Sequence, residues 1–225
     1  MTHIKSFGKN LKGRDFFTSD LHGSFDLLHE QMRLNAFDTS KDRLFVGGDW
    51  CDRNSDSTNI LDYIYEPYIH SVRGNHEEML IQAYEDNLLG HAARMLYNNG
   101  GEWYWDCSPE KQKAIYEAFK SLPLAIEIES SEGLIGIVHA EVPYNDWEKF
   151  RGTTKAELEW SVQAIAQWAR TKYDKQDNSD VKGVRVVLCG HSPTNSGEVE
   201  WLGNQVFADL GSFFRGKISF FELEY

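Results

Sequence analysis

The chain has 225 residues, of which 41% are hydrophobic and 26% are charged, a composition typical of a globular domain and unlike that of disordered, collagenous or coiled-coil chains. No apolar run reaches the roughly 18 residues that a membrane span needs, and residues 1–17 lack the apolar stretch of a secretory signal. The net charge of −12, with no concentration of basic residues, disfavours a nucleic acid as partner, because phosphate backbones bind basic surfaces.

The three cysteines, Cys51, Cys107 and Cys189, are odd in number and far apart, which argues against a disulfide framework. We therefore expect a reduced, cytoplasmic protein. No repeat and no Pro/Gly/Ser-rich linker divides the sequence, so we expect one domain over residues 1–225. An acidic chain can still act on phosphate groups if bound cations supply positive charge locally.

The chain repeats a strand, a polar loop and a helix. Apolar runs predict strands at residues 15–19, 43–46, 68–72, 124–129, 134–138, 184–188, 198–202, 205–210 and 217–224. Helical spacing of apolar residues predicts a helix after Ser24, a helical pattern around residues 60–64 and a helical region over residues 90–121. It also predicts a helix with Leu80, Tyr84 and Leu88 on one face, and another with Leu158, Val162, Ile165 and Ala169 on one face. This order predicts an α/β fold, an α+β sandwich of two mixed sheets flanked by helices.

Local signals mark three boundaries in this pattern. Ser24 is expected to cap the first helix. Thr154 and Glu157 match a capping box for the helix that follows them. Gly203-Asn204, between two apolar runs, indicates a two-residue hairpin turn.

Five loops carry polar residues immediately after a predicted strand. They hold Asp20 with His22, Asp49 with Asp52 and Arg53, Arg73 with Asn75 and His76, His139, and His191. Because loops beyond the carboxyl ends of strands converge at one rim in α/β folds, we expect these groups to meet. Their mixture of imidazole and oxygen donors suits Mn, Fe or Zn better than Ca. Two Asp, one Asn and three His in these loops are of metal-ligand type. Six ligands are more than one catalytic ion needs, whereas two ions that share a carboxylate would use all six.

The order and spacing of these motifs resemble those of a known superfamily. The motifs are Ser19-Asp-Leu-His-Gly, Gly48-Asp-Trp-Cys-Asp-Arg, Gly74-Asn-His-Glu, His139 and Gly190-His191. They resemble those of the metal-dependent phosphoprotein phosphatases, the calcineurin-like metallophosphoesterases, and most of all the phage-lambda-type serine/threonine protein phosphatases, over nearly the whole chain. The resemblance implies the fold of that superfamily and hydrolysis of phosphoserine and phosphothreonine monoesters by a metal-activated water, in a bacterial or a phage-infected cell.

The resemblance also implies a role for each motif residue. Asp20 and His22 hold a first metal, Asp49 bridges to a second, and Asn75, His139 and His191 complete the second site. His76 is the general acid, oriented and kept protonated by Asp52, and Arg53 and Arg73 grip the phosphoryl oxygens. We expect two divalent ions, Mn²⁺ before Fe or Zn. Guanidinium groups match a phosphate in geometry and charge.

Departures from the family pattern affect a turn and a third arginine. Ser19 and Asn54 stand where the family usually has glycine, and asparagine tolerates a positive φ better than most residues. A further family arginine normally follows a tryptophan late in the helix before the last histidine loop. Two tryptophans compete for this register, in Trp160-Ser-Val162 and in Trp168-Ala-Arg170. Val162 lies on the apolar face and cannot bind phosphate, so we expect Arg170 to fill this position.

Each of these residues alone has an ordinary structural interpretation. An Asp before a helix is usually an N-cap, and an arginine is usually part of a surface ion pair; only the ordered set of five loops favours a metal site. Cys51 and Cys189 beside the motifs are expected to be small buried groups. Residues 103–105 could line a substrate groove, but we expect them to pack in the core.

A protein phosphatase is therefore the leading hypothesis, with a phosphorylated protein or peptide as partner and with no nucleic acid, membrane or regulatory subunit. A diadenosine tetraphosphate hydrolase or a broad phosphodiesterase of the same superfamily is the first rival. The tetraphosphatase branch generally lacks the residues present here as Asp52 and Arg73. A second rival, a phosphate-binding metalloprotein without turnover, predicts the loss of a catalytic position such as His76 or Asp52, and both are present.

Overall fold

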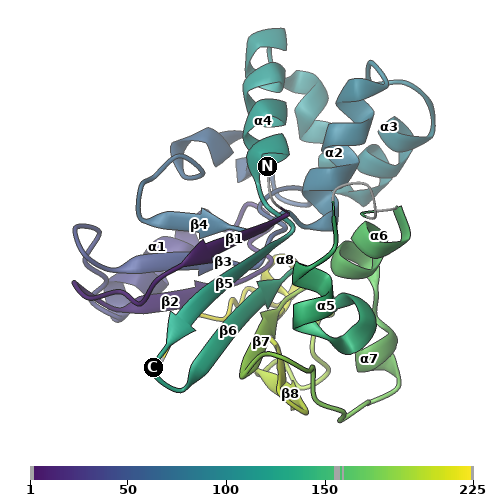
Figure 1. Ribbon diagram of the computed structural model, residues 1–225. Helices are drawn as coiled ribbons and strands as arrows, with labels where there is room; N and C mark the ends of the chain where they lie inside the picture. Colours follow the sequence, from purple (N-terminus) through teal and green to yellow (C-terminus); the bar gives the residue numbers. More distant parts are fainter. Residues whose placement is uncertain (1–2, 155–157, 159, 224–225) are drawn as a thin grey trace.

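The computed structural model describes residues 3–154, 158 and 160–223 (Figure 1). Its strands are β1 (Ile4–Phe7), β2 (Asp15–Thr18), β3 (Arg43–Val46), β4 (Ile69–Ser71), β5 (Ala125–Ser130), β6 (Gly133–Val138), β7 (Val186–Cys189), β8 (Glu200–Leu202), β9 (Gln205–Phe207) and β10 (Phe221–Glu222). Its α-helices are α1 (Phe25–Leu34), α2 (Asn75–Glu85), α3 (Gly90–Leu96), α4 (Pro109–Ser121), α5 (Trp147–Arg151), α6 (Trp160–Trp168), α7 (Thr171–Asp174) and α8 (Ser212–Arg215).

Shorter helical segments complete the chain. Three are 3₁₀ segments, η1 (Ser55–Asp62), η3 (Glu102–Asp106) and η4 (Pro143–Asn145), and η2 (Tyr97–Gly101) is a π-helical turn. Together η2 and η3 join α3 to α4. No helix among the described residues is long and apolar enough to cross a membrane.

The strands form two mixed sheets. The larger has the order β1-β5-β6-β7-β9-β8, and the smaller has the order β10-β2-β3-β4. In the smaller sheet β2, β3 and β4 run parallel, and β10 pairs antiparallel with β2. In the larger sheet β6, β7 and β9 run parallel. Parallel strands end at the same edge of their sheet, so the loops that follow them lie next to one another.

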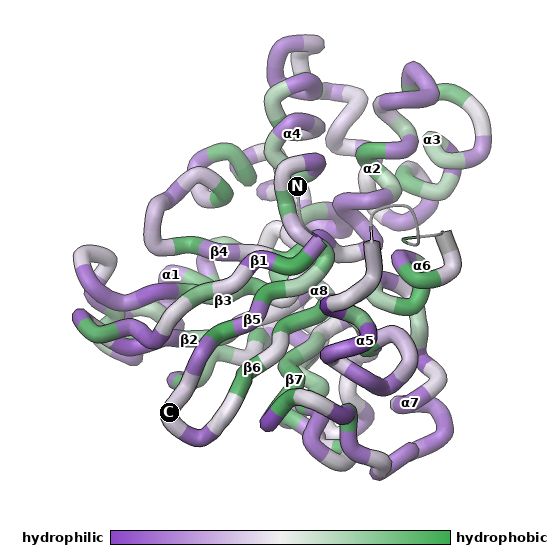
Figure 2. The backbone as a smooth tube through the Cα atoms, viewed as in Figure 1, coloured by the Kyte–Doolittle hydropathy of each residue, from purple (hydrophilic) through white to green (hydrophobic). Residues whose placement is uncertain are grey.

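Three apolar cores separate four layers. Alternate residues of a strand point to opposite faces, so Phe16 packs toward α1 and α2 while Phe17 packs between the two sheets. The core between the sheets includes Ile126, Ile137 and Leu188, all nearly inaccessible to solvent. A third core lies between the larger sheet and α5, α6 and α7. Figure 2 shows hydrophobic stretches along the strands in the middle of the molecule and hydrophilic stretches in the turns at its periphery.

The predicted sandwich of two mixed sheets flanked by helices is confirmed, and each of the nine predicted strands has a counterpart. The predicted last strand, residues 217–224, shortens to β10. The hairpin at Gly203 is present: it has φ +58°, and Leu202 pairs with Gln205 across the turn. The structure adds β1, which pairs parallel with β5 and was not predicted.

The predicted helices differ from the observed ones in their caps and lengths. Ser24 precedes α1, but its side chain makes no capping hydrogen bond. The predicted capping box of Thr154 and Glu157 lies partly outside the described residues. The helix after it is α6, which ends at Trp168, so that neither Leu158 nor Ala169 belongs to it. The predicted helical region 90–121 is helical but is interrupted at Gly100, where φ is +90°.

Candidate metal centre

The two sheets present their site-bearing loops to one another. Asp20 and His22 follow β2, Asp49 follows β3, and Asn75 begins α2 after β4. From the larger sheet, His139 follows β6 directly and His191 follows β7. Six site residues lie in left-handed backbone: Asp20, His22, Asp49, Asp52, Arg53 and His191, with φ between +45° and +76°. This conformation is energetically costly for residues other than glycine, and residues that adopt it cluster at functional sites.

Two overlapping groups of donor atoms form at this junction. One consists of His22, Asp49 and His76, and the other of Asp49, His139 and His191; in each, the donor atoms lie within 4.8 Å of one another and all side chains are buried. Asp49 belongs to both. Its Oδ2 lies 3.8 Å from the Nε2 of His22, and its Oδ1 lies 3.3 Å from the Nε2 of His139. A carboxylate shared between two donor groups is the arrangement that two neighbouring cations require.

Asn75 joins the second group. Its Oδ1 lies 2.8 Å from the Nε2 of His139 and 3.1 Å from the Nδ1 of His191. The amide oxygen, the shared carboxylate and the two imidazoles therefore converge on one small volume. Oxygen and imidazole donors together suit Mn, Fe or Zn.

Backbone carbonyls fix the ring orientation of the three histidines. The Nδ1 of His22 lies 2.8 Å from the carbonyl of Cys51, and the Nδ1 of His139 lies 2.7 Å from that of Gly47. Since a carbonyl accepts only from N–H, each of these two rings carries a proton on Nδ1 and turns its Nε2 toward Asp49. His191 is reversed: its Nε2 lies 3.1 Å from the carbonyl of Trp168 and 3.3 Å from the Nε of Arg170, and its Nδ1 faces Asn75. Such outer hydrogen bonds are usual for metal-binding histidines.

The protonation of these groups fits a cation site. Burial lowers the pKa of both His22 and His191 to about 3, so both are neutral, as a ligand must be. Burial also opposes a charge on His139, but Asp49 outweighs it and raises the pKa of His139 to about 10. Burial alone would raise the pKa of Asp49, and its histidine neighbours instead hold it well below its usual range. In the metal-free protein the positive charge of protonated His139 thus balances the negative charge of Asp49. A divalent ion can supply this positive charge in place of the proton.

Asp20 lies beside both groups but belongs to neither. Its carboxylate accepts hydrogen bonds from the backbone N–H of His191, at 3.0 and 3.1 Å, and from the hydroxyl of Ser19. Burial, with Asp209 as a second carboxylate nearby, raises the pKa of Asp20 well above its usual value. Asp20 therefore links the loops after β2 and β7, and its predicted place as a ligand stays a prediction.

His76 and Asp52 form a buried pair at the edge of the site. The Nδ1 of His76 lies 2.6 Å from Oδ2 of Asp52, and Trp103 donates from Nε1 to Oδ1 of the same carboxylate at 2.8 Å. Burial opposes a charge on His76, but Asp49 and Asp52 outweigh it and raise its pKa. Trp103 is buried, as expected, and its indole N–H adds a polar contact that the sequence did not predict.

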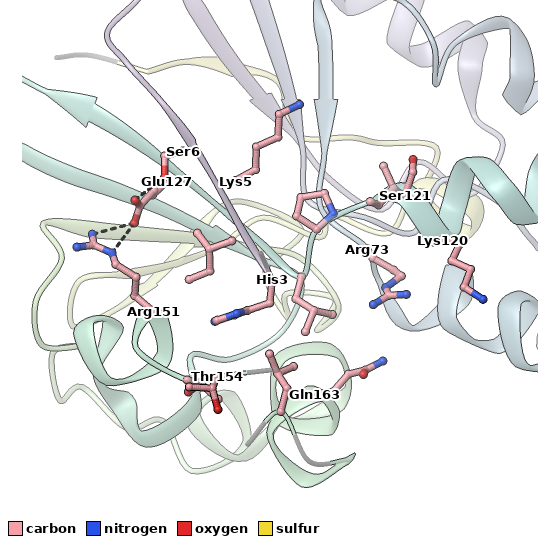
Figure 3. A pocket seen from close by; sticks show the side chains of 16 residues that line it. His3, Lys5, Ser6, Arg73, Lys120, Ser121, Glu127, Arg151, Thr154 and Gln163 are labelled. Carbon is pink, nitrogen blue, oxygen red and sulfur yellow. Dashed lines mark hydrogen bonds and ion pairs between the residues drawn. The ribbon is translucent and has the colours of Figure 1, made fainter. Parts of the chain in front are cut away.

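The three candidate arginines lie in different places. Arg53 Nη2 lies 3.3 Å from the Nε2 of His76, and Arg170 donates from Nη2 to the backbone carbonyl of His191 at 2.9 Å. The guanidinium of Arg73 lies 3.4 Å from Oε2 of Glu78. Arg73 and Lys120 both line a cavity of about 1180 Å³, and Figure 3 shows the two side chains on the same side of it. The structure thus brings Arg53 and Arg170 to the cluster, and it directs Arg73 toward this cavity.

Sequence analysis missed Glu77, which is fully buried. Its carboxylate accepts from the backbone N–H groups of Asp49, Trp50 and Gly74, at 3.0, 2.9 and 2.7 Å. Burial raises its pKa to about 7. The available signal was its position three residues after Gly74 at the start of a helix, where a Glu reaches back to the N-cap amide. Glu77 ties the loop after β3 to the loop after β4.

This fold and this histidine–carboxylate site are those of a metal-dependent phosphoesterase. The sequence model of the calcineurin-like phosphoesterases matches residues 16–221, and the chain belongs to that family. It is 26% identical, over 91% of its length and 90% of the relative's, to serine/threonine-protein phosphatase 2 of Escherichia coli (strain K12).

Two further likenesses concern tetraphosphatases. The chain is 32% identical over 68 residues, 29% of this chain and 25% of the relative, to a symmetrical bis(5'-nucleosyl)-tetraphosphatase of Buchnera aphidicola subsp. Acyrthosiphon pisum (strain Tuc7). Among solved structures it resembles a chain provisionally described as a diadenosine tetraphosphatase, with a TM-score of 0.62, 16% identity and 97% coverage of both chains. At that identity the likeness shows the fold alone.

Proposed function

We propose that the protein is a serine/threonine protein phosphatase that hydrolyses phosphoserine and phosphothreonine monoesters. The observation that carries this proposal is the pairing of His76 with Asp52 at 2.6 Å, beside donor groups that share Asp49. A phosphate-binding protein without turnover would need the donor groups but not a buried acid and its partner. The full-length similarity to a bacterial protein phosphatase supports the substrate class.

Each step of the reaction is assigned to particular side chains. Two divalent ions, for which we propose Mn²⁺, would be held by Asp20, His22, Asp49, Asn75, His139 and His191, and would supply a nucleophilic water and neutralise phosphoryl charge. Arg53 orients the phosphoryl oxygens, and Arg170 stands beside His191 on the other side of the cluster. His76 gives a proton to the departing serine or threonine oxygen. Asp52 orients the ring and favours its protonated form, and such proton transfer contributes about 10²–10⁴-fold to a rate.

A tetraphosphatase is the competing function, since relatives with that name share part of the sequence. Asp52 favours the protein phosphatase, because its carboxylate is engaged by both His76 and Trp103 and is thus built into the site. Arg73 contributes less to this choice, because its guanidinium lies against Glu78.

The deciding experiment compares two substrates at equal enzyme concentration in Mn²⁺. A phosphothreonine peptide and diadenosine tetraphosphate are assayed side by side, and we expect the larger kcat/KM for the peptide. A strong preference for the dinucleotide would assign the protein to the tetraphosphatases. Loss of turnover on both, with phosphate binding retained, would favour the binding protein.

We place this activity in the cytoplasm, and we propose a phosphorylated protein or peptide as partner, without nucleic acid, membrane or regulatory subunit. Free thiols at Cys51, Cys107 and Cys189 suit a reducing compartment. The negative net charge supports the exclusion of nucleic acid.

A further inference from the structure

Helix α8 places two phenylalanines at the rim of the metal centre. It is four residues long and lies between Gly211 and Gly216, both in left-handed backbone at φ +82° and +64°. Ser212 donates from its hydroxyl to the backbone carbonyl of Asp20, and Arg215 donates from Nη1 to the carbonyl of Thr194 at 2.8 Å. These bonds hold the short helix against the loops that follow β2 and β7.

Phe213 lies against two residues of the site. The Cζ of Arg53 lies 4.2 Å from the centroid of the Phe213 ring, and the His22 ring meets the same ring edge-on at 5.5 Å. Phe213 is 42% exposed, although apolar side chains of this size are usually buried. Its neighbour Phe214 is 51% exposed; its ring meets the Phe213 ring edge-on at 4.9 Å, and the Cζ of Arg215 lies 4.8 Å from its centroid.

Arg53 needs support to hold one position. Its side chain is exposed, and a free arginine has many rotamers, whose restriction on binding costs entropy. The Cζ of Arg53 lies over the Phe213 ring, and its Nη2 lies 3.3 Å from the Nε2 of His76. Because two N–H donors repel each other when His76 is protonated, the aromatic ring is the contact that holds the guanidinium. A guanidinium over an aromatic face keeps its N–H groups free at its edges. An anion can therefore still bind there.

We propose that Phe213 is a positioning residue, which holds the Arg53 guanidinium at the metal centre so that it binds the phosphoryl group without first losing its rotamer freedom. The inference rests on the phosphate-binding role of Arg53 in the proposed function. It extends that role to a side chain more than 150 residues away in the chain, with no polar atom and no charge of its own.

The test measures the binding of tungstate, an oxyanion that is not turned over, to the Mn²⁺-loaded protein by isothermal titration calorimetry. Phe213→Leu keeps an apolar side chain but removes the aromatic face, and we expect the Kd for tungstate to rise about 3- to 30-fold. Phe213→Tyr should restore the original Kd. The control is Trp201→Leu, which removes another exposed aromatic ring, on β8, and should leave Kd unchanged.

Arg53→Ala separates the inference from its premise. If Phe213 acts through Arg53, Phe213→Leu adds nothing to the Kd of the Arg53→Ala protein. Two outcomes would overturn the positioning role and leave the proposed function standing. One is an additive effect of the two changes on Kd in the double variant. The other is an unchanged Kd in Phe213→Leu together with a raised Kd in Arg53→Ala. An unchanged Kd in Arg53→Ala would remove the phosphate role of Arg53, and the inference with it. Equal melting temperatures of all variants establish that the folds are intact.

Discussion

At the scale of single residues, the charge of Asp49 organises the site. It is buried, and His22, His76 and His139 all lie within 4 Å of its oxygens. Desolvation would favour its neutral form, so its ionised form depends on these neighbours. His139 carries the compensating proton because Asp49 lies 3.3 Å away, whereas His22 and His191 stay neutral through burial. Asp49 therefore raises the pKa of His139 and His76, whereas burial decides the neutral state of His22 and His191.

His76 has two possible roles in this geometry, as general acid or as ligand. Its Nε2 lies 3.9 Å from Oδ2 of Asp49, within the first donor group, while its Nδ1 is held by Asp52. We expect His76→Asn to lower kcat by about 10²-fold or more, because the leaving oxygen loses its proton donor. Mn²⁺ stoichiometry and affinity, measured by calorimetry on the same preparation, should stay as in the wild type.

His22→Asn provides the contrast. It should weaken Mn²⁺ binding, because it removes an imidazole whose Nε2 faces Asp49. If instead His76→Asn loses one ion per molecule, His76 is a ligand, and its assignment as the acid is wrong.

At the scale of elements, the loops that bear the site were predictable because their signal is local. An apolar strand followed by a polar loop is visible in a few residues, and parallel strands bring such loops to one edge. Strand β1 could not be found in this way. Its sequence Ile4–Phe7 has only one fully buried residue, and its strand conformation depends on pairing with β5, more than a hundred residues later.

Contacts between distant side chains were equally beyond the sequence. The hydrogen bond from Trp103 to Asp52 depends on how η3 packs against the loop after β3. The direction of Arg73 depends on Glu78, and that of Arg53 on Phe213. Residue types and spacing predicted which loops come together, but packing decides where their long side chains point.

The π-helical turn η2 supports Arg53 through Gly100. The backbone N–H of Arg53 donates to the carbonyl of Gly100 at 2.8 Å, and a Cβ at Gly100 would lie 2.5 Å from that same nitrogen. We expect Gly100→Ala to displace Arg53 and to lower both kcat/KM and the free energy of unfolding measured in urea. The strain of φ +90° alone costs roughly 1–2 kcal/mol.

Gly90→Ala is the control for that strain. Gly90 has φ +76°, and a Cβ there would meet nothing within 4 Å. It should lose stability of the order of 1–2 kcal/mol and keep its kcat/KM. Equal activity of the two variants would show that the position of Arg53 does not depend on η2.

At the scale of the whole molecule, the site lies where the two sheets meet. The smaller sheet supplies the loops of Asp20, Asp49 and Asn75, and the larger sheet supplies those of His139 and His191. Away from the site, the sheets are joined by the core that contains Phe17, Phe45 and the larger sheet's isoleucines. A cation bound at the site therefore binds only when both sheets are folded and packed together.

Ion binding should for this reason stabilise the fold as a whole. A ligand that binds only the folded protein at 100 times its Kd adds about 2.7 kcal/mol to the free energy of unfolding. We expect scanning calorimetry to show a single unfolding transition, and we expect its midpoint temperature to rise when Mn²⁺ replaces EDTA. Asp49→Asn should lose most of this shift, because Asp49 belongs to both donor groups. His70→Phe, a change at a half-buried histidine of β4 outside these groups, should keep it. A shift of the same size in Asp49→Asn and in the wild type would place the ions elsewhere on the molecule.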